Sequence, residues 1–324
     1  MNDHPVTVLL PVYNDWASLA ELIEQLDGCL NQSRSSVSLL IVNDGSSVPE
    51  PPSSTLFKPH HSFRDIRLLR LGTNMGHQRA IAVGLSYMAS LGEPADVLVM
   101  DSDGEDTPAD SRALLEASRQ SDKTCLVFAE RSQRSESLAF RIFYVIYRAL
   151  FWCLTGHQVK FGNFSFVPAI YVSRLSNMPE LWNHYAAAAI RSKLPRIAVP
   201  SVRGKRIDGK SHMNTVSLIM HGLSAVSVFS DIVGVRLLCF SLAVASSCVF
   251  VMIGILVIRL FTAYAIPGWA TTAMGITSLL FTNALLLATM FVFFVLSGRT
   301  STPFIPLRDF GKFVDSVEWL RAGK

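Results

Sequence analysis

Residues 97–106 read Val-Leu-Val-Met-Asp-Ser-Asp-Gly-Glu-Asp, an apolar run that ends in a cluster of carboxylates. The run Val97–Met100 is typical of a buried parallel strand, and the acidic turn follows at its carboxyl end. Asp101 and Asp103 can converge on one hard divalent cation, because Mg²⁺ keeps few protein ligands and takes the rest from phosphates and water. Acidic turns are also common as solvated caps, and Asp106 is placed to cap a helix that follows.

The first 130 residues alternate short apolar runs with segments whose apolar residues recur at helical spacing. Helices are expected between the runs, the clearest near residues 77–90 and 109–121. This alternation predicts an α/β fold with a mostly parallel sheet covered on both faces, in which ligands bind beside the carboxyl ends of the strands. The predicted strands are Val6–Leu10, Leu39–Val42, Ile66–Leu71, Val97–Met100 and Leu126–Ala129.

Polar clusters fall at the predicted carboxyl ends of four strands. They are Asn14-Asp15, Asn43-Asp44, Asn74 and Asp101-Ser102-Asp103. An aspartate such as Asp44 can accept hydrogen bonds from a ribose or a base, although each cluster alone is equally typical of a turn or a helix N-cap. The stretch around Asn74 is not a G-x-G-x-x-G fingerprint and the sequence has no Walker lysine motif, which argues against dehydrogenases and P-loop ATPases.

The chain has 324 residues, and its 29 Lys and Arg and 25 Asp and Glu are unevenly distributed. Between Leu237 and Gly298, Arg259 is the only charged residue. Two uncharged runs, Leu237–Ile258 and Ala270–Ser297, are long enough to cross a bilayer as helices, which takes about 20 residues each. The alternative is a helical hairpin buried in a large soluble core, although core helices rarely stay apolar beyond ~18 residues.

Basic residues flank the outer ends of the two predicted spans, and only Arg259 lies between them. By the positive-inside rule, this arrangement predicts a two-helix transmembrane hairpin with both termini in the cytoplasm. The N-terminus is polar and has no signal-peptide pattern, so we expect the globular part to stay on the cytoplasmic side. The net charge of +4 is too small and too dispersed to indicate nucleic-acid binding.

Two further segments are predicted to lie at the membrane surface as helices. Residues 138–155 are rich in aromatic side chains and carry Arg141 and Arg148 on one face, and residues 213–232 are apolar with a polar opposite face. The first segment could equally be a core helix with snorkelling arginines. The predicted domains are a globular part at 1–212, an interfacial helix at 213–232, two spans at 233–298 and a cytoplasmic tail at 299–324.

Basic side chains also gather near the predicted ligand site. They are Arg131 and Arg134 after the fifth strand, and Arg203, Lys205, Arg206, Lys210 and His212 before the second interfacial helix. Such cations can hold phosphate groups by charge-assisted hydrogen bonds. General attraction to anionic lipid headgroups would explain the second cluster as well.

The order of these motifs resembles that of the polyisoprenyl-phosphate glycosyltransferases of glycosyltransferase family 2, which include dolichyl-phosphate mannose synthase and the undecaprenyl-phosphate glucosyltransferases. The resemblance covers about residues 5–297. It implies a GT-A fold and an inverting, Mg²⁺- or Mn²⁺-dependent transfer from a UDP- or GDP-sugar to a polyprenyl phosphate. It also implies a homo-oligomer at the cytoplasmic face of a membrane, here a bacterial inner membrane. The ordered motifs are P-x-Y-N-D at 11–15, N-D-G-S at 43–46, L-G-x-N-x-G at 71–76, D-x-D-x-x-D-x-P at 101–108, G-N-F-S at 162–165 and R-x-x-G-x-S at 206–211.

The resemblance also implies roles for individual residues. Catalytic roles fall to Asp101, Asp103 and Arg206, and the metal would be held by Asp101, Asp103 and Glu105. The nucleotide sugar would be bound by Pro11, Tyr13, Asp15, Asp44, Asn74 and Ser102. Phosphate groups and the acceptor would be bound by Arg131, Arg134, Lys210, Ser211 and His212. Because the acceptor is already an anion, the reaction needs no strong general base, and charge placement and in-line geometry would supply most of the catalysis.

The sequence departs from the family pattern at four places. Asp15 stands where Glu is usual, Gly104-Glu105 replaces Leu-Gln, Asn163 and Ser165 replace Asp and Arg, and His212 replaces Lys. The last three departures indicate a divergent donor or acceptor, or reduced activity. A non-catalytic, membrane-anchored scaffold that retains the fold is therefore the alternative function. A processive polysaccharide synthase is disfavoured, because the chain lacks a Q-x-x-R-W motif and has too few spans.

Overall fold

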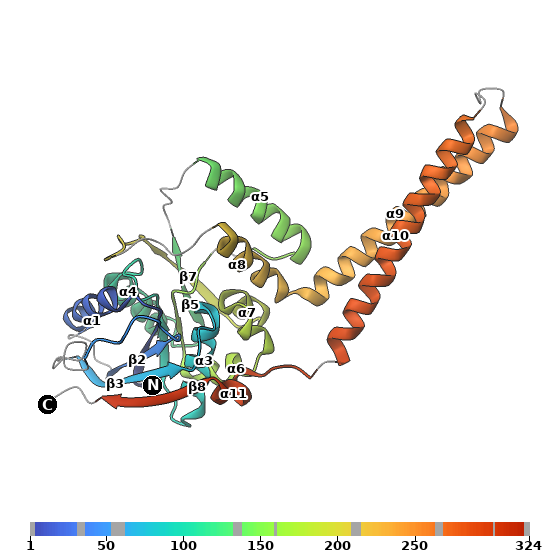
Figure 1. Ribbon diagram of the computed structural model, residues 1–324. Helices are drawn as coiled ribbons and strands as arrows, with labels where there is room; N and C mark the ends of the chain where they lie inside the picture. The colour runs from blue at the N-terminus through green and yellow to red at the C-terminus, as the bar shows by residue number, and fades with distance from the viewer. Residues whose placement is uncertain are drawn as a thin grey trace. The chain divides into compact units, whose positions relative to one another are not determined.

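The computed structural model describes residues 4–30, 36–52, 62–131, 138–158, 161–208, 215–262, 268–300 and 302–320. The chain divides into two compact units (Figure 1). The first unit comprises Met1–Arg148, Gln158–Val228 and Pro303–Lys324, and the second comprises Ala149–His157 and Phe229–Thr302. The chain therefore enters the second unit twice and returns to the first unit each time.

Within the described residues, the first unit contains an eight-stranded sheet in the order β7-β5-β6-β4-β1-β2-β3-β8. The pairs β1–β2, β1–β4, β2–β3 and β5–β7 are parallel, whereas β6 and β8 run antiparallel to their neighbours. The predicted α/β fold with a mostly parallel sheet is confirmed. The strands are β1 Val6–Val12, β2 Val37–Asn43, β3 Phe63–Leu71, β4 Asp96–Val99, β5 Leu126–Arg131, β6 Ser165–Val167, β7 Arg196–Ser201 and β8 Val314–Leu320.

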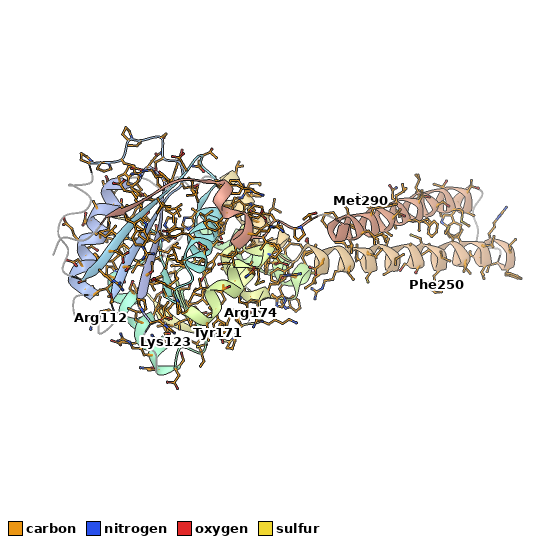
Figure 2. The ribbon with its side chains drawn as sticks, turned by 90° about the horizontal axis from the view of Figure 1, so that it is seen from below. Arg112, Lys123, Tyr171, Arg174, Phe250 and Met290 are labelled. Atoms are coloured by element: carbon orange, nitrogen blue, oxygen red, sulfur yellow. The ribbon has the colours of Figure 1, made fainter. Side chains whose placement is uncertain are left out.

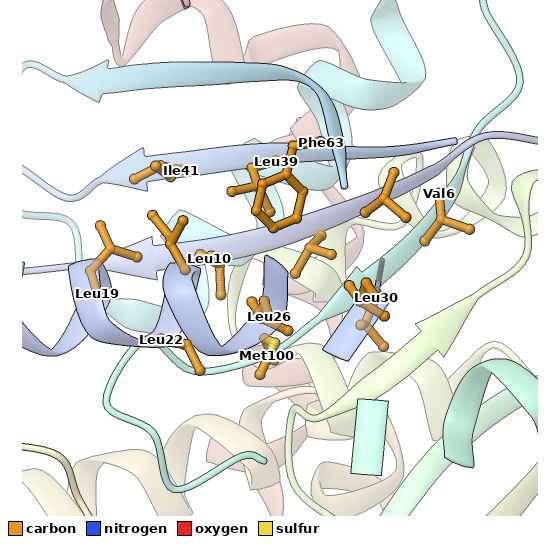
Figure 3. Packing of buried hydrophobic residues seen from close by; sticks show 14 of the residues in the cluster. Val6, Leu10, Leu19, Leu22, Leu26, Leu30, Leu39, Ile41, Phe63 and Met100 are labelled. Carbon is orange, nitrogen blue, oxygen red and sulfur yellow. The ribbon is translucent and has the colours of Figure 1, made fainter. Parts of the chain in front are cut away.

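Helices cover both faces of this sheet. On one face α1 and α4 pack on the strands, and Leu19, Leu22 and Leu26 of α1 are fully buried (Figure 3). On the other face lie α3, α6 and α7, and Tyr185 of α7 is fully buried. Every residue of β1 and β2 is buried for this reason, which explains their nearly continuous apolar sequence. The helices are α1 Trp16–Leu30, α3 His77–Ser90, α4 Pro108–Gln120, α5 Leu138–Thr155, α6 Ala169–Ser176, α7 Tyr185–Arg191, α8 Thr215–Ser227 and α11 Pro306–Asp309, with 3₁₀ turns at Pro179–Trp182 and Phe310–Lys312.

Strand β8 comes from the segment that the sequence predicts to be a cytoplasmic tail. It pairs antiparallel with the outer edge of β3 (Figure 1). Arg67 of β3 stacks on the ring of Trp319 at 4.1 Å, and Arg70 pairs with Glu318 at 2.7 Å. The tail is thus part of the globular unit and covers an edge that would otherwise offer unpaired backbone groups. Local sequence pattern does not reveal this pairing, because the partners lie 248 residues apart.

Two long helices dominate the second unit, α9 Ser230–Phe261 and α10 Trp269–Thr300. Over Ser230–Phe261 and Trp269–Gly298 they are long and apolar enough to cross a membrane, by length and composition. The chain leaves the first unit after Val228 and re-enters it at Pro303. The two helices therefore fit the predicted hairpin.

The long helices pack against each other through small side chains and keep large apolar side chains outside. Ser241 of α9 and Ala284 of α10 are buried in the helix pair. Phe250 of α9 is 75% exposed and Met290 of α10 is 55% exposed (Figure 2). Small residues allow two helices to approach closely, and an apolar exterior is what a lipid-facing surface needs. A hairpin buried in a soluble core would not leave such side chains uncovered.

Candidate active site

The predicted ligand site lies at the carboxyl ends of three neighbouring strands. β2, β1 and β4 are adjacent and parallel, so their carboxyl ends open on the same edge of the sheet. The loops that follow these strands carry Asp44, Asp15 and Asp101. The structure thus brings together polar clusters that are far apart in the sequence.

Arg206 joins two of these loops. It follows β7, and its guanidinium pairs with the carboxylate of Asp15 at 2.7 Å and with that of Asp103 at 3.2 Å. The three side chains are between 17% and 20% exposed. A guanidinium carries several N–H donors in one fixed plane, so a single arginine can bind two carboxylates at once. Arg206 therefore fixes the spacing between the β1–α1 loop and the acidic turn.

Backbone contacts hold the acidic turn against the segment that follows β7. The amide of Gly204 donates to the carbonyl of Glu105 at 2.9 Å, and the amide of Ile207 donates to the carbonyl of Asp103 at 3.0 Å. Gly104 has a φ of +83°, and a Cβ there would meet the Ile207 side chain at 2.5 Å. The departure to glycine at position 104 thus has a structural reason, because this backbone conformation and close approach disfavour a side chain.

Asp106 stabilises the acidic turn through a hydrogen bond within the turn. Its buried carboxylate accepts a hydrogen bond from the amide of Asp101 at 2.9 Å, and Ser102 is buried in the same turn. The N-cap of α4 is Thr107, whose hydroxyl accepts from the amide of Asp110, and not Asp106. Asp106 therefore serves to fix the position of Asp101.

Glu105 faces a second arginine. Nε and Nη2 of Arg203 bind the two carboxylate oxygens of Glu105 at 2.8 and 2.6 Å. Bidentate pairing of this kind fixes the relative geometry of an arginine and a carboxylate. The residue predicted to be the third metal ligand is thus engaged by a guanidinium, and it would reach a cation only after leaving Arg203.

Asp101 lies beside His77, the first residue of α3. Nε2 of His77 is 3.0 Å from Oδ1 of Asp101. Desolvation lowers the pKa of His77, but the charges of Asp101, Asp106 and Asp44 outweigh it and raise the pKa above its ordinary value. His77 has no role among the residues predicted from the sequence. Its position directly after the motif that contains Asn74 is the sequence feature that could have indicated a role.

The acidic turn concentrates negative charge in a way that suits a divalent cation. Burial raises the pKa of Asp103, and the neighbouring charges of Asp101 and Glu105 raise it further, against the opposing effects of a backbone hydrogen bond and Arg206. Among the described residues, no three or more His, Cys, Asp or Glu side chains are grouped to hold a metal ion. Mg²⁺ and Mn²⁺ can be held by one or two carboxylates together with substrate phosphates. Asp101 and Asp103 fit that kind of site.

Asp44 organises the loop that follows β3. Its two carboxylate oxygens accept from the amides of Met75 at 2.7 Å and Gly76 at 2.9 Å, and Asn74 accepts from the amide of Gly76 at 3.0 Å. Burial raises the pKa of Asp44, although these backbone hydrogen bonds oppose the shift. Asp44 and Asn74, both predicted to bind the nucleotide, thus also shape the loop beside the carboxyl end of β2.

Asn14 ties the end of β1 to the loop after β2. It has a φ of +62°, and its side-chain oxygen accepts from the amides of Ser47 at 2.8 Å and Val48 at 2.9 Å. Asparagine tolerates this left-handed backbone better than most residues. Pro11 is buried within β1, whereas Tyr13 is 39% exposed. Tyr13 is therefore accessible to a ligand, while Pro11 and Asn14 shape the end of the strand.

Several predicted phosphate-binding residues lie outside the described part of the chain. They are Arg134, Lys210, Ser211 and His212. Arg131 ends β5, opposite Ser201 of β7. Because β6 is antiparallel to both β4 and β5, β5 runs parallel to β4 and ends at the same edge of the sheet. The backbone of Arg131 is thus on the edge that carries the acidic turn.

A small pocket opens beside the acidic turn. Asn163 and Ser165, which depart from the family pattern, form hydrogen bonds next to it. Gln78 donates to the carboxamide oxygen of Asn163 at 3.1 Å, and the hydroxyl groups of Ser165 and Tyr185 are 2.6 Å apart. Gln78 and Tyr185 have no predicted role, since only the fold brings them to this place. The pocket is lined by Asp101, Asp106, Ala129, Gly162, Asn163, Phe164 and Ser201.

Residues 7–172, about half of the chain, match the family Glycosyl transferase family 2. The chain belongs to glycosyl transferase family 2. The matched region runs from β1 into α6 and includes the loops that carry Asp15, Asp44 and the acidic turn. The predicted enzyme class, a glycosyltransferase, is confirmed.

This glycosyltransferase is similar to bacterial relatives along much of its length. It is 24% identical over 290 residues to the uncharacterized glycosyltransferase YkcC of Bacillus subtilis (strain 168), a match that covers 87% of this chain and 85% of YkcC. It is 23% identical over 181 residues to the uncharacterized glycosyltransferase sll0501 of a Synechocystis species, a match that covers 54% of each chain.

Solved structures share its fold. Glucosyl-3-phosphoglycerate synthase from Mycobacterium tuberculosis, in complex with Mn²⁺, UDP-glucose and phosphoglyceric acid, matches with a TM-score of 0.51 at 13% identity. The match covers 71% of this chain and 80% of that chain. The UDP complex of the same enzyme gives a TM-score of 0.50. These likenesses confirm the predicted GT-A fold.

Proposed function

We propose that this glycosyltransferase transfers a sugar from a nucleotide diphosphate sugar to a polyprenyl phosphate at the cytoplasmic face of a membrane. The observation that carries the proposal is the convergence of Asp15, Asp103 and Arg206 in a chain that also has two membrane-length helices. Carboxylates can hold a cation and a guanidinium can hold a phosphate, so the site offers both signs of charge that this transfer needs.

The donor would lie along the carboxyl ends of β1, β2 and β4. The nucleotide would be bound by Tyr13, Asp15, Asp44 and Asn74, at the strand end shaped by Pro11, with Ser102 in the acidic turn. The structural relative bound to Mn²⁺ and UDP-glucose supports a nucleotide sugar and a divalent metal. Asp101 and Asp103 would hold Mg²⁺ or Mn²⁺, which would stabilise the negative charge of the departing nucleotide.

Cationic side chains would receive the phosphate groups. Arg206 is held beside the acidic turn by its two carboxylate partners, which gives its guanidinium a fixed position. Since the acceptor phosphate is already an anion, the protein needs to align the reactants and neutralise charge rather than remove a proton with a strong base. The other proposed phosphate and acceptor residues are Arg131, Arg134, Lys210, Ser211 and His212.

Exposed apolar side chains support a membrane location. α9 and α10 would cross the membrane as a hairpin, with both termini in the cytoplasm and the protein forming a homo-oligomer in a bacterial inner membrane. Amphipathic helices with exposed apolar residues lie in the membrane interface, which we propose for α5 and α8. These exposed residues are Val145, Ile146, Leu150 and Trp152 of α5, and Val216, Ile219, Met220 and Leu223 of α8.

A donor screen tests the proposal. Purified protein in vesicles is given polyprenyl phosphate, Mg²⁺ or Mn²⁺ and a panel of UDP- and GDP-sugars, and lipid-linked product is measured by mass spectrometry. We expect product with one donor class and a loss of at least about 100-fold in kcat/KM for Asp103→Asn, because that change removes a carboxylate proposed to hold the divalent cation.

The matched control for this substitution is Asp122→Asn, since Asp122 is exposed and its φ of +52° suits asparagine equally well. Activity of this variant should equal that of the wild type. If no nucleotide sugar binds in the presence of Mn²⁺, the proposed function is wrong and the scaffold alternative is favoured.

A further inference from the structure

A chain of hydrogen bonds runs from the start of α7 to the pocket beside the acidic turn. The backbone amide of Tyr185 donates to Oε1 of Gln78 at 2.7 Å, and Nε2 of Gln78 donates to Oδ1 of Asn163 at 3.1 Å. Asn163 lines the pocket together with Asp101 and Asp106. The side-chain carboxamide of Gln78 therefore links helix α3, helix α7 and the segment before β6.

The first link of this chain fixes the direction of the others. A backbone N–H can only donate, so the group that Gln78 turns to Tyr185 must be its carbonyl oxygen. The amide nitrogen of Gln78 then faces Asn163, which must present its own oxygen to accept. The two N–H groups of Asn163 are consequently directed away from Gln78, and no described residue accepts a hydrogen bond from them.

A second set of contacts holds the same residue through its backbone. The hydroxyl of Ser165 donates to the carbonyl of Asn163 at 2.9 Å, so the hydroxyl of Tyr185, 2.6 Å away, is the group that donates to Ser165. Tyr185 is fully buried, and burial raises the pKa of its hydroxyl, which therefore remains a donor. Both the backbone and the side chain of Asn163 are thus held by the protein core.

The pocket presents acceptors and donors on different residues. Asp101 and Asp106 line it with carboxylate oxygens, which accept hydrogen bonds, while the side-chain nitrogen of Asn163 can only donate. A sugar hydroxyl is neutral and both donates and accepts, so it matches this arrangement.

We infer that Asn163 donates a hydrogen bond to a hydroxyl oxygen of the transferred sugar and so helps to determine donor specificity. Gln78 is the positioning residue that fixes the orientation of the Asn163 carboxamide. The inference rests on the proposed function, because it needs a sugar nucleotide as the donor. An aspartate at position 163 could only accept, so asparagine reverses the polarity of this contact.

The test compares variants on a parent donor and its analogues. The donor is the UDP- or GDP-sugar of the panel that gives most lipid-linked product, and each of its monodeoxy analogues is assayed for kcat/KM. In the wild-type protein we expect one analogue to lose about 10- to 100-fold, since one partner of a buried hydrogen bond is removed. Asn163→Ala should lower kcat/KM on the parent sugar by that same factor. For this variant, kcat/KM on the deoxy analogue should be less than about twofold below its value on the parent sugar.

Two conservative variants separate positioning from folding. Asn163→Asp keeps the acceptor for Gln78 and replaces the donor, so it should fold and should discriminate against the parent sugar at least as strongly as Asn163→Ala. Gln78→Glu keeps the acceptor for the Tyr185 amide but cannot donate to Asn163, so we expect a loss of about 3- to 10-fold confined to the same hydroxyl. Asn177→Asp, at an exposed amide that donates to the Ser173 carbonyl, is the matched control and should change nothing.

The outcomes distinguish this inference from the proposed function. If the wild type forms no product with any donor, the proposed function fails and the inference fails with it. If the wild type is active and every deoxy analogue loses the same factor in the wild type and in folded Asn163 variants, only the inference is overturned. A melting temperature equal to that of the wild type identifies the folded variants.

Discussion

Two arginines contact the acidic turn in different environments. Arg206 is 20% exposed and pairs with Asp15 and Asp103, whereas Arg203 is 42% exposed and pairs with Glu105. Exposed ion pairs contribute little, about 0–1 kcal/mol, because water screens them. We therefore expect Arg206 to contribute more to activity than Arg203, although both are basic residues of the same short segment.

Arg206→Lys tests the role of the guanidinium. A lysine ammonium is a point charge that cannot bind two carboxylates in one plane, so the spacing between Asp15 and Asp103 would be lost. We expect kcat/KM in the donor assay to fall about 10- to 100-fold, which corresponds to the roughly 1.5–3 kcal/mol of a charged hydrogen bond.

Arg203→Lys is the matched comparison for this variant. Its exposed position predicts a fall of less than about fivefold, since such pairs are worth about 0–1 kcal/mol. Equal effects of the two substitutions would show that the bridge to Asp15 does not position the acidic turn.

At the scale of an element, α7 begins at a buried histidine. Nδ1 of His184 accepts from the amide of Ala187 at 3.3 Å, and its Nε2 is 3.2 Å from Nε2 of His221 on α8. Because Nδ1 accepts, we assign the hydrogen of the neutral ring to Nε2, which donates to His221. Burial and the nearby His221 and His77 lower the pKa of His184 to about 3, and burial also lowers the pKa of His221.

This shift predicts a loss of stability in acid. The unfolded chain binds a proton at His184 near its ordinary pKa of 6.5, while the folded protein resists protonation down to about 3. The stability that depends on a neutral His184 is therefore fully present above pH 6.5. It decreases as the pH falls below that value. At pH 5 the free energy of unfolding should be about 2 kcal/mol lower than at pH 7.5 from this group.

Thermal melts of the wild type and His184→Asn over pH 4.5 to 8 measure this effect. Asparagine is a good N-cap and does not titrate, so the variant should keep α7 while its melting temperature depends less on pH. A pH dependence that is the same in both proteins would mean that His184 is not the responsible group.

At the scale of the whole molecule, the end of the chain completes the sheet that its beginning starts. β8 pairs with β3 after the chain has passed through α9 and α10, and the aromatic side chains of Phe304 and Phe313 pack on Trp182 at 4.2 and 5.1 Å. The last segment is therefore anchored at the sheet and at the core face formed by α3, α6 and α7. The chain thus returns to the first unit after α10 and ends in its sheet.

Val317→Pro tests whether β8 stabilises the fold. Val317 is paired with Leu69 and packs against the core, so proline would disturb the strand and remove an apolar side chain, at a cost of about 3 kcal/mol. We expect the melting temperature of the globular unit to fall by roughly 6–12 °C. Val317→Thr keeps the β-branched shape and should have a smaller effect. An unchanged melting temperature for Val317→Pro would mean that the segment behaves as a free tail.

Much of the candidate site was predictable because it follows strands with a strong local pattern. Asp15, Asp44 and Asp101 come directly after apolar runs, and parallel strands place such residues at one edge of the sheet. Gln78 and Tyr185 were not predictable, since neither stands in a motif and each acts through a neighbour that only folding supplies. The partner of Glu105 was also missed, because side-chain pairing depends on where the segment after β7 lies.

Local sequence patterns were enough to predict the parallel sheet, the acidic turn and the two membrane-length helices. These features depend on hydrophobic periodicity and on residues close together in the chain, so they can be read locally. Three contacts emerge only in the folded chain: residues 314–320 pair with β3, Arg206 binds Asp15 191 residues away, and Gln78 binds Asn163. Each of these contacts joins distant segments, and their geometry is set by the packing of the whole core rather than by any local pattern.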